Sequence, residues 1–264
     1  MPRFNTSQEE WKAFLEGTHP VILRGARLFG HLPSGPRCRM CSAPFGPPIG
    51  NVFRRYGFTP WEKNPNLCMR CLNGLEEQAV SGAEVESSFL FADVRRSSEL
   101  ARELGTWEFT RLMQRFYEVA TAVLLRNDAL LDKFVGDEVV GFFLPFMAGK
   151  EHASRAVGAA EELLAATGHG DPGGPWLPMG AGVHTGEAFV GLVSRGGSSE
   201  FTALGDVPNV AAHLAGHARV GEVLVTEAVA ASSGGRWDGL ERRRLSLKGH
   251  SVEAVVVVAG SVTS

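Results

Sequence analysis

The sequence has no long apolar run: none approaches the roughly 20 residues that a membrane-spanning helix requires. It also shows no internal repeat and no long low-complexity segment. The first residues do not form a signal peptide, because residues 7–12 (Ser-Gln-Glu-Glu-Trp-Lys) have the pattern of a polar helix start. With 264 residues, 44% of them hydrophobic, the chain can bury a large core. We therefore expect a cytoplasmic protein of one or two domains that does not associate with a membrane.

Cysteine is scarce as well. The chain has four cysteines, which form two Cys-x-x-Cys pairs with 26 residues between the pairs: Cys38, Cys41, Cys68 and Cys71. In a cytosolic chain this spacing is that of a four-thiolate zinc site, because each pair offers two sulfurs to one tetrahedral ion. An iron–sulfur cluster, which takes the same thiolates, and a redox pair of disulfides stay open as alternatives. We expect one structural zinc ion per chain, holding together a module too small for a core of its own.

The net charge is small, −3, but the positive and negative residues are unevenly distributed along the chain. Through residue 75 there are 10 Lys or Arg against 4 Asp or Glu, whereas the remainder carries 16 against 25. Nine of the 14 prolines also lie before residue 75, which makes this part rich in loops. The asymmetry predicts two modules: a Cys-rich module with a short linker helix over residues 1–80, and a second domain over residues 86–260.

Aromatic residues alternate with arginines between the two cysteine pairs, as in residues 53–58 (Phe-Arg-Arg-Tyr-Gly-Phe). Such a pattern can stack and clamp a nucleic acid. The alternative is that the aromatic rings cover the metal site while the arginines dock on the acidic second domain. We favour the alternative and do not expect a nucleic-acid partner, because the patch is short and the whole protein is acidic. A protein partner for the Cys-rich module stays open.

Two carboxylates stand out in the second domain, and each follows an apolar, strand-like run. Asp93 ends the run Phe-Leu-Phe-Ala, and Asp137 follows Lys-Phe-Val-Gly. A fold presents an acidic side chain in this way at the edge of a buried sheet. Two such edges brought together would hold two hard divalent ions, as a phosphoryl-transfer site does. Alternatively, one Asp caps a helix and the other belongs to a Gly-Asp hairpin turn.

The order of elements predicts an α+β fold with helices on one face of a largely antiparallel sheet. A short helix from residue 72 is expected to give way to a linker through residues 81–82. An apolar stripe predicts that the helix after residue 98 buries Leu104, Trp107 and Phe116. The remaining expected elements are a strand over residues 88–94, a hairpin over 130–134 and 138–144, a helix over 151–166, a strand pair over 177–184 and 188–193, and a helix from 206 with Pro208 near its start.

Two further motifs follow the Asp segments: residues 183–187 (Val-His-Thr-Gly-Glu) and residues 201–214 (Phe-Thr-Ala-Leu-Gly-Asp-Val-Pro-Asn-Val-Ala-Ala-His-Leu). In order and spacing, the four motifs resemble the class III nucleotidyl cyclase catalytic domain, the family of adenylate and guanylate cyclases. The resemblance covers about residues 86–260. It implies a ferredoxin-like antiparallel sheet with helices, and an enzyme of signal transduction that converts a nucleoside triphosphate into a cyclic nucleotide and pyrophosphate.

The resemblance also implies roles for the residues around the two carboxylates. Asp93 and Asp137 would hold two ions of Mg²⁺ or Mn²⁺ per active site. The turn of Arg95, Arg96, Ser97 and Ser98 at a helix N-terminus would face the phosphates with its backbone N–H groups. Lys248 matches the family's triphosphate-contacting lysine, although a surface lysine on a strand edge is an equal alternative.

Base choice in this family is carried by two positions, which here are Lys133 and Thr202. A Lys and a Thr can donate to and accept from the adenine edge, whereas guanine-selective members usually carry an acid at the Lys position. The resemblance therefore favours ATP over GTP, and cyclic AMP as product. Without the family register, Lys133 would be read as a solvated strand residue and Thr202 as a β-former.

Asn209 matches the family's ribose-orienting asparagine, and His213 stands where the family places its transition-state arginine. Their i, i+4 spacing puts both on one helix face. Histidine is shorter, only partly charged at neutral pH, and lacks the bidentate fork that suits phosphate. Arg96 is a second departure, because the family usually has Gly there to let the backbone approach the phosphates. Arg96 either supplies a compensating cation or blocks the loop.

In the family, the base-contacting pair and the Asn–Arg pair come from the subunit opposite the metal ligands, so an active site implies a homodimer. Two hypotheses follow. The first is an adenylate cyclase whose Cys-rich module senses metal or redox state or docks a partner. The second is a degenerate cyclase fold that serves as a nucleotide-binding or regulatory domain. The retained Asp93, Asp137 and Asn209 support the enzyme, whereas His213 and Arg96 support the second hypothesis. We expect the enzyme.

Overall fold

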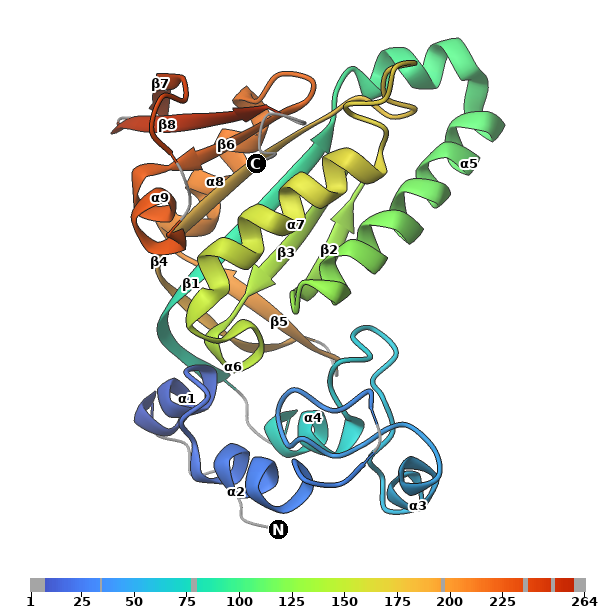
Figure 1. Ribbon diagram of the computed structural model, residues 1–264, viewed down its shortest axis with the longest axis vertical. Helices are drawn as coiled ribbons and strands as arrows, with labels where there is room; N and C mark the ends of the chain where they lie inside the picture. The colour runs from blue at the N-terminus through green and yellow to red at the C-terminus, as the bar shows by residue number, and fades with distance from the viewer. Residues whose placement is uncertain are drawn as a thin grey trace. The chain divides into compact units, whose positions relative to one another are not determined.

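The computed structural model describes residues 8–33, 35–76, 80–195, 198–234, 237–247 and 250–258 (Figure 1). Packing divides the chain into two compact units. The first comprises Met1–Glu86, Leu144–Gly149 and Glu187–Leu204. The second comprises Ser87–Phe143, Lys150–Gly186 and Gly205–Ser264. Two long strands, β1 (Val80–Val94) and β4 (Met179–Arg195), run through both units.

The first unit contains α1 (Gln8–Leu15), α2 (Pro20–Phe29), α3 (Ile49–Arg54), α4 (Met69–Glu76), α6 (Pro145–Ala148) and β5 (Ser198–Leu204). Pro20 is at the first position of α2, where its missing N–H costs little, and the His19 ring accepts a hydrogen bond of 3.2 Å from the amide of Val21. The helix α1 packs on α6, with the rings of Phe14 and Phe146 5.2 Å apart. This contact joins the start of the chain to α6, a segment of the same unit that is far away in the sequence.

The Cys-rich part of this unit has a small core of its own. The rings of Phe29, Phe53 and Phe58 form a cluster with centroid distances of 5.1 to 5.9 Å. The guanidinium of Arg70 lies 5.0 Å from the centroid of the Phe58 ring. The aromatic residues and one of the nearby arginines therefore pack against one another, which leaves open both the nucleic-acid interpretation and its alternative.

The second unit carries α5 (Ser97–Arg126), β2 (Leu130–Val135), β3 (Glu138–Phe143), the 3₁₀ turn η1 (Gly149–Glu151), α7 (His152–Ala166), α8 (Asp206–His217), β6 (Glu222–Thr226), α9 (Glu227–Ser233), β7 (Arg242–Leu247) and β8 (His250–Val258). In the part of the chain that the structure describes, the sheet order is β2-β3-β1-β4-β6-β8-β7, and β5 pairs with β4 outside this path. The pairs β1–β3, β2–β3, β4–β5, β6–β8 and β7–β8 are antiparallel, whereas β4 and β6 pair in parallel. The α+β fold with a largely antiparallel sheet is confirmed.

Helices cover more of the sheet than expected. All five residues of β6 are buried, so both of its faces are covered. Leu224 of β6 packs with Val210 and Leu214 of α8, while α7 and α9 also contact β6. The expectation of helices on one face is therefore wrong at β6. Among the described helices, none has the length and apolar content needed to cross a membrane.

Three expected elements differ from the structure. The strand β1 begins at Val80, so the predicted linker through residues 81–82 is strand. The predicted strand pair over residues 177–193 is the single strand β4. The helix α5 begins at Ser97 as expected, but Gly105 interrupts it with φ 76° and ψ 164°. As a result, Leu104 and Trp107 do not continue the buried stripe, and Trp107 is 74% exposed.

Candidate active site

The two predicted carboxylates lie on neighbouring strands. Asp93 is the penultimate residue of β1 and faces Glu138 of β3 in the antiparallel register. Asp137 precedes Glu138 in the turn between β2 and β3, and its carbonyl accepts a hydrogen bond of 3.1 Å from the amide of Val94. The strand pairing therefore brings three acidic residues, Asp93, Asp137 and Glu138, to one edge of the sheet.

Burial and mutual repulsion disfavour the charged forms of the carboxylates at this acidic edge. Burial raises the pKa of Asp93, the nearby Arg95 opposes that shift, and the charge of Asp137 adds to it. Burial raises the pKa of Glu138 too, and the charges of Asp93 and Asp137 add to the effect. Carboxylate oxygens are the ligands that Mg²⁺ and Mn²⁺ prefer, so the donor set fits hard divalent ions.

Arg95 connects this edge to the end of α8. Its guanidinium forms an ion pair with the Asp93 carboxylate and donates hydrogen bonds to the carbonyls of Gly216 (3.2 Å) and Ala218 (3.4 Å). Its amide donates to the carbonyl of Pro178 at 2.8 Å, just before β4. Arg95 thus holds the end of β1 against the end of α8 and the segment before β4. Its role at the site is to position Asp93.

Arg96 occupies a backbone conformation that favours glycine. It precedes α5 with φ 58° and ψ 33°, in the left-handed region. Its guanidinium pairs with Glu99 and its side chain is 72% exposed. The first N–H groups of α5 have no partner within the helix, and the helix dipole makes this end attractive to anions. The Arg96 side chain is directed to Glu99 at the first turn of α5, and its proposed role toward the phosphates stays a prediction.

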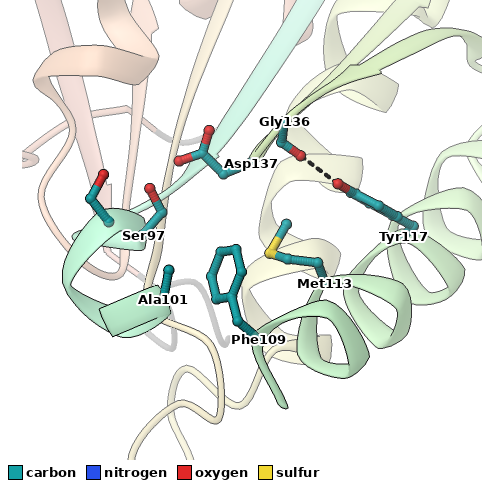
Figure 2. A pocket seen from close by; sticks show the side chains of 8 residues that line it. Ser97, Ala101, Phe109, Met113, Tyr117, Gly136 and Asp137 are labelled. Atoms are coloured by element: carbon teal, nitrogen blue, oxygen red, sulfur yellow. Dashed lines mark hydrogen bonds between the residues drawn. The ribbon is translucent and has the colours of Figure 1, made fainter. Parts of the chain in front are cut away.

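A cavity of about 350 Å³ lies beside Asp137 (Figure 2). On one side it is lined by Ser97, Ser98 and Ala101 from the first turns of α5. Residues after the break at Gly105 line the other side, namely Phe109, Met113 and Tyr117. Gly105 has φ 76° and ψ 164°, which essentially only glycine adopts. This break lets two parts of one helix line the same cavity, with the phosphate-binding candidates Ser97 and Ser98 on its rim.

Tyr117 supports the turn that carries Asp137. Its hydroxyl donates a hydrogen bond of 2.5 Å to the carbonyl of Gly136 (Figure 2). Its ring lies 4.4 Å from that of Phe134. Burial raises the pKa of Tyr117, and the charge of Asp137 adds to the shift. The phenol therefore stays protonated and can keep donating this bond.

Asn209 and His213 lie on α8, as predicted. Asn209 is exposed and its amide donates to the carbonyl of Gly205 at 2.9 Å, whereas His213 is half-buried. The helix rests directly on β4 at Gly182, where an added Cβ would overlap the backbone of Ala215. Glycine at this position lets α8 approach the sheet closely, which sets the depth at which Asn209 and His213 sit.

His184, from the Val-His-Thr-Gly-Glu motif, supports the same region from β4. Its Nδ1 is 2.8 Å from the Thr226 hydroxyl at the end of β6. Burial lowers the pKa of His184 to about 4, and the charge of Asp206, at the start of α8, opposes the shift. His184 is therefore neutral at physiological pH and has a structural role.

The base-contacting and triphosphate-contacting predictions stay untested. Thr202 is half-buried on β5 in the first unit. Lys133 lies on β2 opposite Val140, and its side chain is outside what the structure describes. Lys248 lies outside the described residues altogether. The four cysteines do come together, in the first unit, with all four sulfurs within 4.8 Å of one another.

Sequence reasoning missed Glu138 and Tyr117. Glu138 directly follows Asp137, but it faces Asp93 only through the pairing of β1 with β3, two strands separated in the chain by α5 and β2, and the sequence does not specify that register. Tyr117 follows Phe116, a member of the predicted stripe, but no pattern in the sequence indicates its hydrogen bond to the carbonyl of Gly136. Apart from the glycine itself, nothing in the sequence predicts the break in α5 at Gly105.

A largely antiparallel α+β sheet with paired carboxylates beside a helix N-terminus is the arrangement expected of a nucleotidyl cyclase domain. Residues 81–259 match the family of the adenylate and guanylate cyclase catalytic domain. Because this match covers more than half of the chain, the chain belongs to that family.

Curated relatives carry adenylate cyclase names. Adenylate cyclase 1 of Rhizobium meliloti is 29% identical over 136 residues, which are 50% of this chain and 20% of that protein. The terminal-differentiation specific adenylate cyclase of Dictyostelium discoideum is 25% identical over 143 residues, 53% of this chain and 7% of that protein. The chain thus matches a fifth or less of the length of these two relatives.

Solved structures confirm the fold. The adenylyl cyclase CyaB from P. aeruginosa superposes with a TM-score of 0.57 and 23% identity, covering 70% of this chain and 100% of that chain. A guanylyl cyclase superposes with a TM-score of 0.60 and 21% identity, covering 69% of this chain and 96% of that chain. At these identities the likeness supports the fold, and it does not distinguish the two nucleotides.

Proposed function

We propose that the chain is an adenylate cyclase, which converts ATP into cyclic AMP and pyrophosphate at the interface of a homodimer. The observation that carries the proposal is the acidic edge formed by Asp93, Asp137 and Glu138 beside the N-terminus of α5. Membership of the cyclase family supports the reaction class.

Cyclisation requires the ribose 3′-hydroxyl to lose its proton and attack the α-phosphorus in line while pyrophosphate leaves. Two bound divalent ions would supply positive charge at the attacking and leaving oxygens. Asp93 and Asp137 would hold those ions, since both offer hard carboxylate oxygens at adjacent strand ends. Ser97 and Ser98, at the start of α5, would bind phosphate oxygens through backbone N–H groups that the helix leaves without partners.

ATP is the proposed substrate because of Lys133 and Thr202, the residues at the family's base-contacting positions. Lys133 would donate to the adenine edge, and Thr202 can donate and accept there. The adenylate cyclase names of two curated relatives agree with this choice. Lys248 is proposed to contact the triphosphate.

A homodimer follows if Lys133, Thr202, Asn209 and His213 act on the nucleotide held by the metal ligands of the opposite subunit. In a two-fold dimer of this kind each site takes residues from both chains. Asn209 would orient the ribose, and His213 would place an imidazolium near the reacting phosphate. Each isolated chain would be inactive.

The direct test is to incubate the purified full chain with ATP, GTP, CTP or UTP and Mn²⁺ or Mg²⁺, and to identify any cyclic product by mass. We expect cyclic AMP from ATP, with slower or no turnover of the other three. Cyclic GMP as the main product would overturn the choice of ATP. No cyclic product from any of the four would overturn the enzyme assignment.

Asp137→Asn tests the metal ligands, because a neutral amide is a poor ligand for a hard cation. It should remove nearly all activity and leave the fold and the dimer intact. The matched control is Asp171→Asn, since Asp171 is an exposed carboxylate on the loop before β4. Near-parental activity in Asp137→Asn, or equal loss in both variants, would contradict the assignment.

Mixing two inactive variants tests the shared site. Asp137→Asn lacks a metal ligand and Asn209→Ala lacks the proposed ribose contact. If each site takes these residues from different chains, half of the randomly mixed dimers contain one intact site of two. Activity should then return to about a quarter of the parental value. Mixtures that stay inactive, although subunits exchange, would place both residues in one chain.

A further inference from the structure

The four cysteine sulfurs form a cage of the size that one metal ion needs. All four lie within 4.8 Å of one another, and the sulfurs of Cys41 and Cys68, from different pairs, are 3.8 Å apart. A tetrahedral zinc site with Zn–S distances of about 2.3 Å has sulfur–sulfur edges of about 3.8 Å. The cage comes from two segments far apart in the chain.

We propose that Cys38, Cys41, Cys68 and Cys71 bind one zinc ion that holds the Cys-rich part of the first unit together. The cysteines are buried or half-buried, which removes them from solvent and suits a closed structural site. This proposal is independent of the cyclase function.

The same distances argue against the two alternatives. A disulfide requires sulfurs about 2.05 Å apart, and the 3.8 Å between Cys41 and Cys68 is far longer. In a multinuclear iron–sulfur cluster the thiolates bind different iron ions, separated by bridging sulfides. Those thiolates must stand further apart than the ligands of a single ion. A cage with all sulfurs within 4.8 Å encloses one ion.

Backbone hydrogen bonds hold each Cys-x-x-Cys pair in a turn. In the first pair, the amide of Ser42 donates to the carbonyl of Cys38 at 2.8 Å and the amide of Cys38 donates to Ala43 at 2.9 Å, which closes a tight turn. In the second, Cys68 directly precedes α4 and the amide of Cys71 donates to the carbonyl of Cys68 at 3.0 Å. The second pair therefore lies in the first turn of a helix.

The fold around the cage depends on the two pairs staying together. A Cβ added at Gly25 of α2 would lie 2.6 Å from the carbonyl oxygen of Cys41, so α2 packs directly on the first pair. The amide of Arg39, between the first two cysteines, donates to the carbonyl of Asn66 at 2.8 Å. Besides these contacts, Met40, Phe45 and Leu67 are buried here, and the half-buried rings of Phe29, Phe53 and Phe58 pack on one another. A metal ion is the usual supplement for a core of this size.

The first test is elemental analysis of the full chain, purified under reducing conditions. We expect about one zinc per chain, and release of that zinc when a mercurial reagent has blocked four thiols. Cobalt put in place of zinc should show the visible absorption of a tetrahedral tetrathiolate site. Iron in place of zinc, or fully reduced protein without metal, would overturn the proposal.

Cysteine variants test which residues bind the ion. Cys41→Ser and Cys68→Ser should each lower the zinc content severalfold. The matched control is Met40→Leu, because Met40 is buried within the first pair and its thioether is not an expected zinc ligand. Unchanged zinc in both Cys variants would overturn the site. If these variants do not fold, the stoichiometric release from the parental chain decides the question.

Hydrogen exchange tests the structural role. After zinc removal by a chelator, amides of α2 and α4 should exchange about tenfold faster or more, whereas β1, β2 and β3 keep their protection. Parental exchange rates in α4 after complete zinc loss would contradict the structural role. Cyclase activity is not needed for any of these readouts, so a failure here is distinct from a failure of the proposed function.

Discussion

The hydroxyl of Tyr117 donates a 2.5 Å hydrogen bond to the carbonyl oxygen of Gly136, the residue that precedes Asp137 (Figure 2). The bond joins the middle of α5 to the turn between β2 and β3. Gly136 itself has φ 63°, the left-handed conformation that a tight turn requires. Tyr117 is therefore placed to fix the position of the Asp137 carboxylate.

Tyr117→Phe should lower kcat by roughly two- to thirteenfold, the range that corresponds to loss of one hydrogen bond of about 0.5–1.5 kcal/mol. The apparent affinity for Mn²⁺ should fall as well, because the carboxylate is less well positioned. The matched control is Tyr56→Phe, the same change at the chain's other tyrosine, which is 66% exposed in the first unit. Equal kinetics of both variants and the parent would contradict this role of Tyr117.

Arg96 allows a test of backbone conformation. Arg96→Gly and Arg96→Ala both lose the guanidinium and its ion pair with Glu99, so their difference reports the left-handed φ of 58°. The Gly variant should be more stable than the Ala variant by about 1 kcal/mol in urea unfolding. If the two variants unfold at the same urea concentration, this position is not strained.

The same pair of variants addresses catalysis. Because the Arg96 guanidinium is exposed and pairs with Glu99, we expect Arg96→Gly to keep or exceed parental turnover. A large loss of turnover in both variants would show that Arg96 supplies a cation to the phosphates.

Much of this fold was predictable because local signals and long-range pairing agree. The hairpin of β2 and β3 has apolar strands on both sides of Gly136, and the structure confirms it. At β4 the local signals and the long-range pairing disagree. Gly186 and Glu187 have the composition of a turn, but pairing with β6 on one stretch and with β5 on the next keeps the strand extended through them. Pairing of this kind depends on partners that are distant in the chain.

The placement of the two carboxylates was predictable from the sequence, whereas their role as metal ligands stays a prediction. Asp93 and Asp137 end apolar runs, and the structure places them at adjacent strand ends. The contributions of Arg95 and Tyr117 depend on which carbonyl groups lie within reach, namely those of Gly216 and Gly136. No local pattern encodes such contacts. They follow from the packing of α8 and α5, which the sequence alone does not specify.

His184 predicts a pH dependence of stability. Its folded-state pKa is lowered from 6.5 to about 4, so the unfolded chain binds the proton more readily between these values. Stability is therefore fully present above pH 6.5 and decreases as the pH falls toward about 4. His184→Asn, which keeps a polar group near Thr226 but cannot titrate, should reduce this decrease by up to about 3 kcal/mol.

The measurement is urea unfolding across that pH range, with His31→Asn as a control at an exposed histidine. His169, whose pKa is also lowered by burial, contributes in the same direction and is present in all three proteins. If the parent and His184→Asn lose stability in parallel as the pH falls, His184 is not the buried neutral group described above.

The last prediction concerns His213, which stands at the family's arginine position on α8, four residues after Asn209. An imidazole can place a positive charge near phosphate only while protonated, and it is largely neutral at alkaline pH. A guanidinium stays charged and can bind phosphate oxygens in two places. His213→Arg should therefore raise turnover by roughly tenfold, or about 1.4 kcal/mol of transition-state stabilisation, and most of all at alkaline pH.

The matched control is His217→Arg, which introduces the same side chain one turn later, at an exposed histidine of α8. His213→Ala completes the set and should turn over more slowly than the parent. All four proteins should be compared as pH–rate profiles on saturating Mn–ATP. A gain in His213→Arg alone would mean that position 213 is within reach of the reacting phosphate. Coincident profiles for the parent, His213→Arg and His213→Ala would show that this side chain does not contact it.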